Sequence, residues 1–174
     1  MPSRFAVLGS VLLALVLLAV VMPGTETGPS PLAGPADRIV VEKAQRRLTL
    51  FRGAMPLRSY RVALGSQPVG AKVHEGDGRT PEGLYTIDRR NPVSRYHLAL
   101  HLSYPDARDR ARAAALGVSP GGDVMIHGMR RGLGWLGPLH RLKDWTRGCI
   151  AVTDAEVDEI AQAVPDGTVV EIRP

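Results

Sequence analysis

One cysteine and one upstream histidine are the residues whose types and surroundings can support covalent chemistry in this sequence. Cys149 is the only cysteine in 174 residues and lies in the run Asp-Trp-Thr-Arg-Gly-Cys-Ile-Ala-Val, residues 144–152. His127 ends the apolar run Val-Met-Ile and precedes Gly128. A lone thiol with a histidine elsewhere in the chain is typical of a nucleophile and its base, because an imidazole that takes the thiol proton provides a thiolate at neutral pH.

The same residues allow other interpretations. Free cysteine is among the most buried residue types, so a solitary one is often inert core filler. Thr146 and Gly148, however, indicate a tight turn before Cys149 rather than the middle of a strand. His140 is a rival base that is closer in sequence, but no strand-like run presents it, and geometry rather than sequence distance selects a base. The sequence therefore favours Cys149 with His127.

The N-terminal segment indicates export. Residues 5–22 carry no charge and follow Arg4, so residues 1–22 are predicted to be a signal peptide or an uncleaved anchor in the inner membrane. Residues 23–37 are rich in Pro, Gly, Ser and Thr and are predicted to be a flexible linker, which leaves 38–174 as the catalytic domain. Exported proteins use cysteines mainly in disulfides, and one cysteine cannot form an internal disulfide. A location in the periplasm or cell envelope therefore strengthens the interpretation of Cys149 as reactive.

The charge and composition of the chain limit the classes of partner that it is expected to bind. The formal net charge is +5, which favours anionic surfaces such as a cell wall or a membrane. Nucleic acid is not expected, because the basic residues are scattered and no nucleic-acid-binding motif is present. The sequence has five histidines but lacks the zinc-peptidase helix motif, so no metal is expected, and thiol chemistry of this kind needs no cofactor.

Apolar alternation and turn residues predict a β-rich α+β domain with two short covering helices. The helices are expected over 106–116 and after Thr153, which has the spacing of a capping box with Glu156. A glycine-rich loop over 65–83 and an irregular loop over 128–143 are expected near the site. The predicted strands cover 39–43, 46–52, 57–64, 83–89, 96–103, 123–126 and 168–172.

Three ordered motifs resemble the catalytic domain of the L,D-transpeptidase (YkuD-like) family. They are Thr80-Pro81-Glu82-Gly83-Leu84-Tyr85, Ile126-His127-Gly128 and Thr146-Arg147-Gly148-Cys149-Ile150. The resemblance covers residues 38–174, is similar to a subgroup with an Asp-Trp-Thr-x-Gly-Cys motif, and implies the family's β-sandwich-like fold. The chain departs from the usual pattern in two places: Arg147 replaces a second histidine, and residues 130–143 lengthen the spacer between His127 and Cys149.

The residues together with this resemblance lead to a specific expectation. An exported cysteine acyltransferase would attack a peptidoglycan stem peptide through Cys149, form a thioester and pass the acyl group to an acceptor amine. His127 would be the base, the Gly128 carbonyl would orient it, and the Gly148 amide would stabilise the oxyanion. Substrate contacts are expected from five residues, namely Tyr96, His101, Trp145, Thr146 and Arg147.

Two alternatives remain open at this point. The segment Ser94-Arg95-Tyr96-His97 resembles a family branch that includes an amidase releasing wall-bound proteins, so water can replace the amine and a wall-linked protein can be a partner. The second alternative is a wall-binding module without catalysis, for which Arg147 is the only support.

Overall fold

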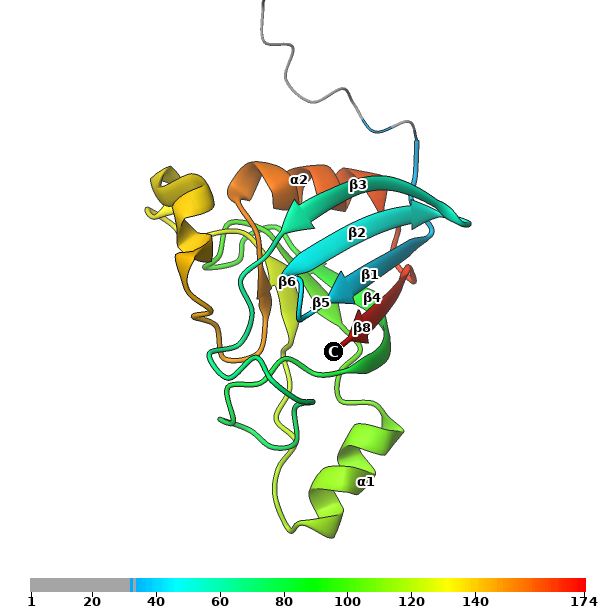
Figure 1. Ribbon diagram of the computed structural model, residues 1–174, viewed down its shortest axis with the longest axis vertical. Coiled ribbons are helices and arrows are strands. Elements are labelled where there is room, and N and C mark those ends of the chain that lie inside the picture. Colours follow the sequence, from blue (N-terminus) through cyan, green and yellow to red (C-terminus); the bar gives the residue numbers. More distant parts are fainter. Residues whose placement is uncertain (1–31, 33) are drawn as a thin grey trace, which may run out of the picture. The chain divides into compact units, whose positions relative to one another are not determined.

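The computed structural model of the protein describes Leu32 and residues 34–174 (Figure 1). The predicted signal peptide or anchor and most of the predicted linker lie outside these residues. Within the described part of the chain, no helix has the length and apolar character needed to cross a bilayer.

The described residues form one curled, mixed sheet of eight strands in the order β3-β2-β1-β8-β4-β5-β6-β7. Two pairings, β1 with β8 and β6 with β7, are parallel, and the others are antiparallel. The strands are β1 Arg38–Glu42, β2 Arg47–Arg52, β3 Met55–Arg61, β4 Gly83–Asn91, β5 Ala99–Leu102, β6 Met125–His127, β7 Ile150–Ala151 and β8 Val169–Arg173. The long strand β4 joins the two halves, because its first part pairs with β8 and its second part with β5.

The two ends of the sheet meet. Beyond β3, Ala63 exchanges both backbone hydrogen bonds with Ala151 of β7, at N···O distances of 2.9 and 2.8 Å. Leu64 and Ser66 continue this contact by bonding to the backbone of Thr146. The closure explains the sandwich-like fold and holds the segment that carries Cys149 against the chain that leaves β3.

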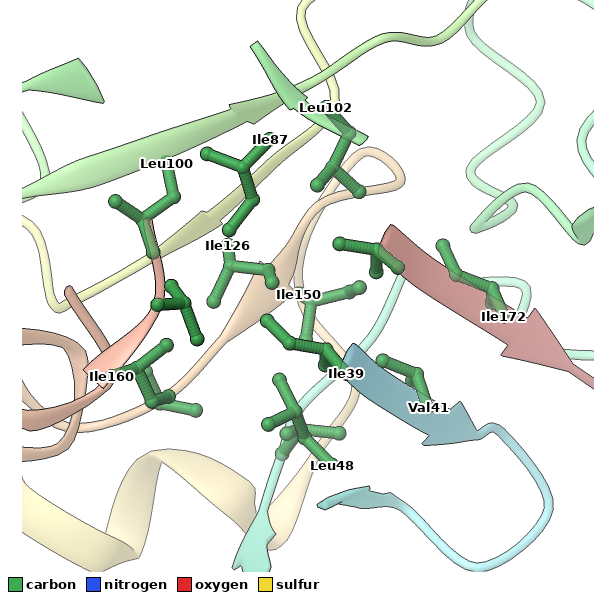
Figure 2. Packing of buried hydrophobic residues seen from close by; sticks show 14 of the residues in the cluster. Ile39, Val41, Leu48, Ile87, Leu100, Leu102, Ile126, Ile150, Ile160 and Ile172 are labelled. Atoms are coloured by element: carbon green, nitrogen blue, oxygen red, sulfur yellow. The ribbon is translucent and has the colours of Figure 1, made fainter. Parts of the chain in front are cut away.

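A single core lies between the two halves of the curled sheet (Figure 2). Ile39 and Leu48 enter it from one half, and Leu100 and Ile126 enter it from the other. The helix α2 (Asp154–Ala163) closes the core with Ile160, and all five side chains are fully buried. Each buried side chain removes apolar surface from water, which is the main force that keeps β6 and β7 in place.

Both predicted helices are present. In α1 (Ala107–Ala115), Asp106 caps the N-terminus, Asp109 is buried against the Tyr85 hydroxyl, and the arginines are exposed. In α2, Thr153 and Glu156 form the predicted capping box.

Three differences from the sequence prediction bear on the cleft. The strand β5 begins three residues later than expected because His97 has a φ of 62°, which an extended strand does not accommodate. The loop predicted over 128–143 contains a 3-10 helical segment, η1 (Gly134–Leu142), with a kink at Gly137, where φ is 48°. The strand β3 ends at Arg61, because the chain then turns to pair with β7.

Candidate active site

Cys149 and His127 line the same cleft, which has a volume of about 810 Å³. The parallel pairing of β6 and β7 sets His127 opposite Ala151 and Ile126 opposite Ile150. Cys149 directly precedes β7, so this register sets it beside Met125, two residues before the position of His127. Because side chains alternate between the two faces of a sheet, the thiol and the imidazole then lie on the same face, opposite to the buried Ile126 and Ile150. The sequence motifs are therefore adjacent in space although a long segment separates them in the chain.

His127 is held in one tautomer. Its side chain is only 3% exposed, and Nδ1 lies 2.7 Å from the carbonyl oxygen of Gly128. Because a carbonyl oxygen only accepts hydrogen bonds, Nδ1 carries the proton and Nε2 keeps its lone pair. The ring stacks on Tyr96 at 4.5 Å between centroids and meets Trp145 edge-on at 5.8 Å. Burial lowers the pKa of His127 more than the Gly128 bond raises it, which keeps the imidazole neutral at pH 7.

Cys149 is in its thiol form at rest. Sγ donates a hydrogen bond to the carbonyl oxygen of Asp123 at 3.6 Å, and burial raises the pKa of the thiol. Among the residues that the structure describes, no hydrogen bond joins Sγ to His127. The resting pair is therefore a thiol and a neutral imidazole, and a proton must move for the sulfur to react.

The turn before Cys149 is fixed by Thr146. This side chain is 5% exposed, and its hydroxyl donates to the Cys149 carbonyl at 2.7 Å while it accepts from the Gly148 amide at 3.1 Å. The prediction that the Gly148 amide stabilises an oxyanion does not fit this geometry, because that N–H already points at Thr146. Gly148 is needed for another reason: its φ is 132°, and a Cβ would lie 2.6 Å from the Arg79 carbonyl oxygen.

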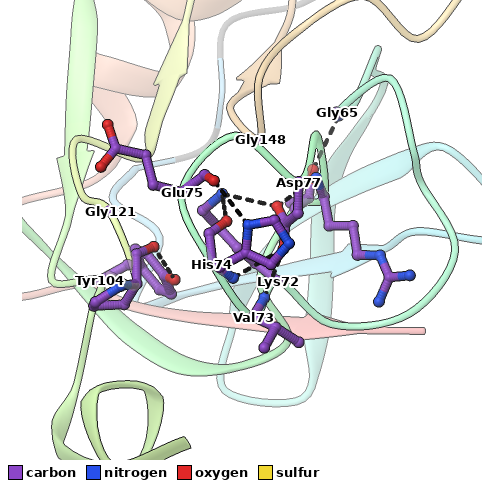
Figure 3. Close-up of polar contacts among 12 residues, drawn as sticks. Gly65, Lys72, Val73, His74, Glu75, Asp77, Tyr104, Gly121 and Gly148 are labelled. Atoms are coloured by element: carbon purple, nitrogen blue, oxygen red, sulfur yellow. Dashed lines mark hydrogen bonds and ion pairs between the residues drawn. The ribbon is translucent and has the colours of Figure 1, made fainter. Parts of the chain in front are cut away.

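The glycine-rich loop forms one wall of the cleft and is organised around Asp77 (Figure 3). The Asp77 carboxylate accepts the amides of Val73, His74 and Arg79 at 2.7, 3.1 and 3.0 Å. It also accepts Lys72 Nζ at 2.9 Å. Burial pushes the pKa of Asp77 up, but these bonds lower it more, to about 2. Lys72 lines the cleft, but its ammonium group donates its hydrogen bonds to Asp77 and to the His74 carbonyl of the loop.

The predicted substrate contacts fall into two groups. Tyr96, Trp145, Thr146 and Arg147 line the cleft, and Arg147 is exposed there. His101 is not among the lining residues, because its ring is held between the carboxylates of two flanking aspartates on the neighbouring strand and loop, Asp88 and Asp123. The substrate contact expected from His101 stays a prediction.

The rival base lies elsewhere. His140 is 7% exposed and lines a separate apolar pocket of about 370 Å³, on the other side of Trp145 from the cleft. Trp145 Nε1 donates to His140 Nδ1 at 3.5 Å. Burial, with a contribution from Arg141, lowers the pKa of His140 to about 4. It is therefore neutral at pH 7, and its place in the apolar pocket separates it from Cys149.

Besides Arg147, charged residues that were not among the predicted substrate contacts line the cleft. Arg95 and Arg147 are exposed cations, and Glu75 and Asp123 are exposed carboxylates on the same cleft. Arg95 could have been predicted from the sequence, because it directly precedes Tyr96, a predicted substrate contact. The two acidic residues lie in loops, where no sequence pattern indicates them. Within Leu32 and residues 34–174, no group of three or more His, Cys, Asp or Glu side chains is placed to hold a metal ion.

Comparison with known proteins agrees with this geometry. The model of the YkuD family, described as the L,D-transpeptidase catalytic domain, matches residues 36–172. The chain belongs to this family. The sequence is also similar to YafK of Escherichia coli (strain K12), whose name gives L,D-transpeptidase as a provisional activity, with 32% identity over 139 residues. That match covers 76% of this chain and 49% of YafK, so the chain spans about half the length of its curated relative.

Solved structures in the family share the fold. Pgp2, a helical cell shape determining protein from Campylobacter jejuni, has a TM-score of 0.60 at 26% identity, over 82% of this chain and 49% of Pgp2. An L,D-transpeptidase from Mycobacterium smegmatis has a TM-score of 0.53 at 14% identity, over 80% of this chain and 59% of that chain. The second likeness concerns the fold alone.

Proposed function

We propose that the chain is an exported cysteine acyltransferase that remodels peptidoglycan by an L,D-transpeptidase reaction. The observation that carries the proposal is the pairing of a lone thiol with a buried histidine whose Nε2 lone pair is free, in one cleft of an L,D-transpeptidase-family domain. Peptidoglycan stem peptides are the substrate class on which this family acts.

The first half of the reaction forms a thioester. His127 Nε2 takes the proton of Cys149 Sγ, and the sulfur bonds to the carbonyl carbon of a stem peptide. The resulting tetrahedral oxyanion collapses, the amide C–N bond breaks, and His127 returns its proton to the leaving amine. Release of that amine leaves the acyl group on the sulfur and the imidazole neutral, as it began.

Two backbone groups assist this step. The Gly128 carbonyl holds the proton of Nδ1 and stabilises the imidazolium that forms, a role that a carboxylate has in many catalytic triads. Because the Gly148 amide is bound to Thr146, the adjacent Cys149 amide is the backbone donor that we propose for the oxyanion. Thr146 then contributes by fixing the turn in which that amide lies.

The second half resolves the thioester. An acceptor amine attacks the carbonyl carbon while His127 takes its proton, a C–N bond forms, and the C–S bond breaks. Water in place of the amine would give a carboxylic acid and make the enzyme a cell-wall hydrolase or amidase. The same residues perform both reactions, so the acceptor that reaches the cleft decides between them.

The charges on the cleft support a substrate that carries carboxylates. Arg147 and Arg95 have no ion-pair partner within residues 34–174, so both guanidinium groups are free to bind an anion. We infer that Arg147 binds a stem-peptide carboxylate. Arg147→Ala is expected to raise KM about tenfold or more while kcat changes less, and Arg110→Ala on the exposed face of α1 is the matched control. A loss confined to kcat would assign Arg147 to the chemical step instead.

Export is part of the proposal. Residues 1–22 would direct the chain to the periplasm or cell envelope, and residues 5–22 would anchor it to the inner membrane if they are not cleaved. Fractionation of cells that produce the full chain, with the N-terminal residue of the mature protein identified by mass spectrometry, tests this. Recovery in the cytoplasmic fraction would contradict it.

The central experiment incubates the full chain with purified stem peptides and measures the masses of peptide and protein. A thioester adduct on Cys149 together with crosslinked peptides is expected, and Cys149→Ser should give neither. Shortened or released stems without crosslinks would identify a hydrolase. No adduct with stem peptides or with a carbapenem, in a protein shown to be folded, would leave a wall-binding module as the function.

A further inference from the structure

The carboxylate of Asp154 binds the same peptide group whose carbonyl oxygen binds the ring of His127. Asp154 is the first residue of α2, but it does not take part in the capping box of that helix, which Thr153 and Glu156 form. Its Oδ1 instead accepts the amide of Met129 at 2.7 Å, in the loop that follows β6. The helix that follows the nucleophile thus contacts the backbone that follows the base.

One peptide group connects this carboxylate to the imidazole. The Gly128–Met129 peptide donates its N–H to Asp154 and accepts the Nδ1 proton of His127 with its C=O, at 2.7 Å on each side. A peptide whose N–H is bound to an anion has more negative charge on its oxygen, because hydrogen bonds in a chain polarise one another. The Gly128 oxygen is therefore a stronger acceptor than an ordinary carbonyl.

Two glycines make room for the carboxylate. A Cβ on Gly128 would lie 2.6 Å from Asp154 Oδ1, and a Cβ on Gly134 would collide with Oδ2. The backbone on either side is also fixed, since the Gly128 amide donates to Leu98 and the His127 carbonyl accepts from Val152, at 3.1 and 3.0 Å. The arrangement of carboxylate, peptide and imidazole is consequently rigid.

We propose that Asp154 is a positioning residue that acts through the Gly128–Met129 peptide to orient His127 and raise its basicity. The proposal rests on the function proposed above, because it takes His127 as the base of Cys149. The peptide keeps the formal charge away from the ring, so His127 remains neutral at rest, while the imidazolium that forms during attack is stabilised through the polarised carbonyl. Asp154 would thus orient the imidazole and stabilise the imidazolium through the intervening peptide, as a directly bonded carboxylate does in other triads.

Other titratable and charged groups surround this arrangement without entering it. Around Asp154 and His127, the neighbouring elements present Glu156 paired with Arg141, Asp158 paired with His97, and also Arg131, His140, Tyr96 and Cys149. Within residues 34–174, none of their side chains hydrogen-bonds to the Gly128–Met129 peptide. Asp158 lies one turn after Asp154 on α2 and supplies a charge-matched control.

The test measures the rate at which iodoacetamide alkylates the full chain from acidic to mildly basic pH. Cys149 is the only thiol, so the mass gain reports this residue alone. Asp154→Asn keeps the shape and an acceptor oxygen but removes the charge. It is expected to slow alkylation at pH 7 by about threefold to tenfold and to move the acidic limb of the rate profile to lower pH. Asp158→Asn is expected to leave both unchanged.

The proposal would be overturned if Asp154→Asn kept the wild-type alkylation rate and acidic limb, or if Asp158→Asn shifted the limb equally. A slower rate with an unmoved limb would also overturn it, since that pattern belongs to a purely structural role. If Asp154→Asn does not fold, the wild type decides, because NMR should show a strongly downfield Met129 amide proton, and an ordinary shift would refute the bond to the carboxylate. Alkylation needs no stem peptide, so failure of the proposed substrate leaves this test intact.

Discussion

The Thr146 side chain cross-links the turn before Cys149 through two hydrogen bonds. Replacing it with valine removes both bonds and keeps nearly the same side-chain shape. The hydroxyl binds both the Gly148 amide and the Cys149 carbonyl in a site that is 5% exposed. In Thr146→Val both groups lose their partner, and each unpaired buried group costs about 1–3 kcal/mol. Because the second lone pair of a carbonyl is less demanding than an amide N–H, we expect a total loss of about 2–4 kcal/mol.

The expected loss translates into two measurements. For a protein of this size, the melting temperature should fall by about 6–12 °C in calorimetry. The rate of Cys149 acylation by a carbapenem, followed by mass spectrometry, should fall by about a hundredfold, because a shift of the turn misplaces both Sγ and the Cys149 amide. Thr146→Ser retains the hydroxyl and should stay within about 1 kcal/mol of the wild type.

A second control separates the turn from the general effect of losing a buried hydroxyl. Thr49 is also 5% exposed and shares a hydrogen bond of 2.8 Å with Ser59, away from the cleft. Thr49→Val should lower stability but leave the acylation rate unchanged. A Thr146→Val protein with wild-type melting and acylation would refute the reasoning. Faster acylation would show that the released Gly148 amide, and not the Cys149 amide, stabilises the oxyanion.

Three further predictions concern the turn before Cys149 and the contacts that hold the glycine-rich loop. Gly148→Ala should destabilise the domain by about 2–4 kcal/mol in thermal unfolding, because its φ of 132° and the Arg79 carbonyl at 2.6 Å both exclude a Cβ; an unchanged melting temperature would contradict this. Lys43→Met should cost about 2–4 kcal/mol in urea unfolding, because it removes the buried ammonium that binds the partly exposed Glu82 and two loop carbonyls, and a neutral result would mean that this lysine is dispensable. The folded-state pKa of Asp77 is about 2, below its ordinary 3.8, so its contribution to the free energy of unfolding is present above about pH 4 and is lost as the pH falls toward 2. In urea unfolding, Asp77→Asn should lack this loss of stability in acid. An identical pH dependence of stability in the variant and the wild type would refute the reasoning.

Much of the fold follows from local patterns in the sequence. The capping box of Thr153 and Glu156 begins α2 where the spacing predicts it, since both partners lie within one turn of the chain. The strands β1 and β2 also form where the apolar residues predict them, although the predicted half-buried alternation is absent, because Val40 and Thr49 on the second face are buried as well. The chemistry-bearing pair is visible in the same way, because a lone cysteine after a glycine and a histidine after an apolar run together indicate a nucleophile and its base.

What the sequence did not determine depends on contacts between distant segments. The acceptor of the Gly148 amide could not be read from the motif, because the Thr146 hydroxyl reaches it only in the folded turn. The two partners of the His101 ring, Asp88 and Asp123, are equally non-local, because they come from another strand and from a loop.

The sequence by itself identified the candidate reacting groups, because thiol, imidazole and glycine are fixed by residue type and local spacing. Only the tertiary structure decided which of the two nearby histidines lies in the cleft. The parallel register of β6 and β7 puts the side chains of His127 and Cys149 on one face of the sheet, in the cleft, while η1 places His140 in a separate pocket. Register and burial arise from the packing of the whole core, and for this reason no local pattern contains them.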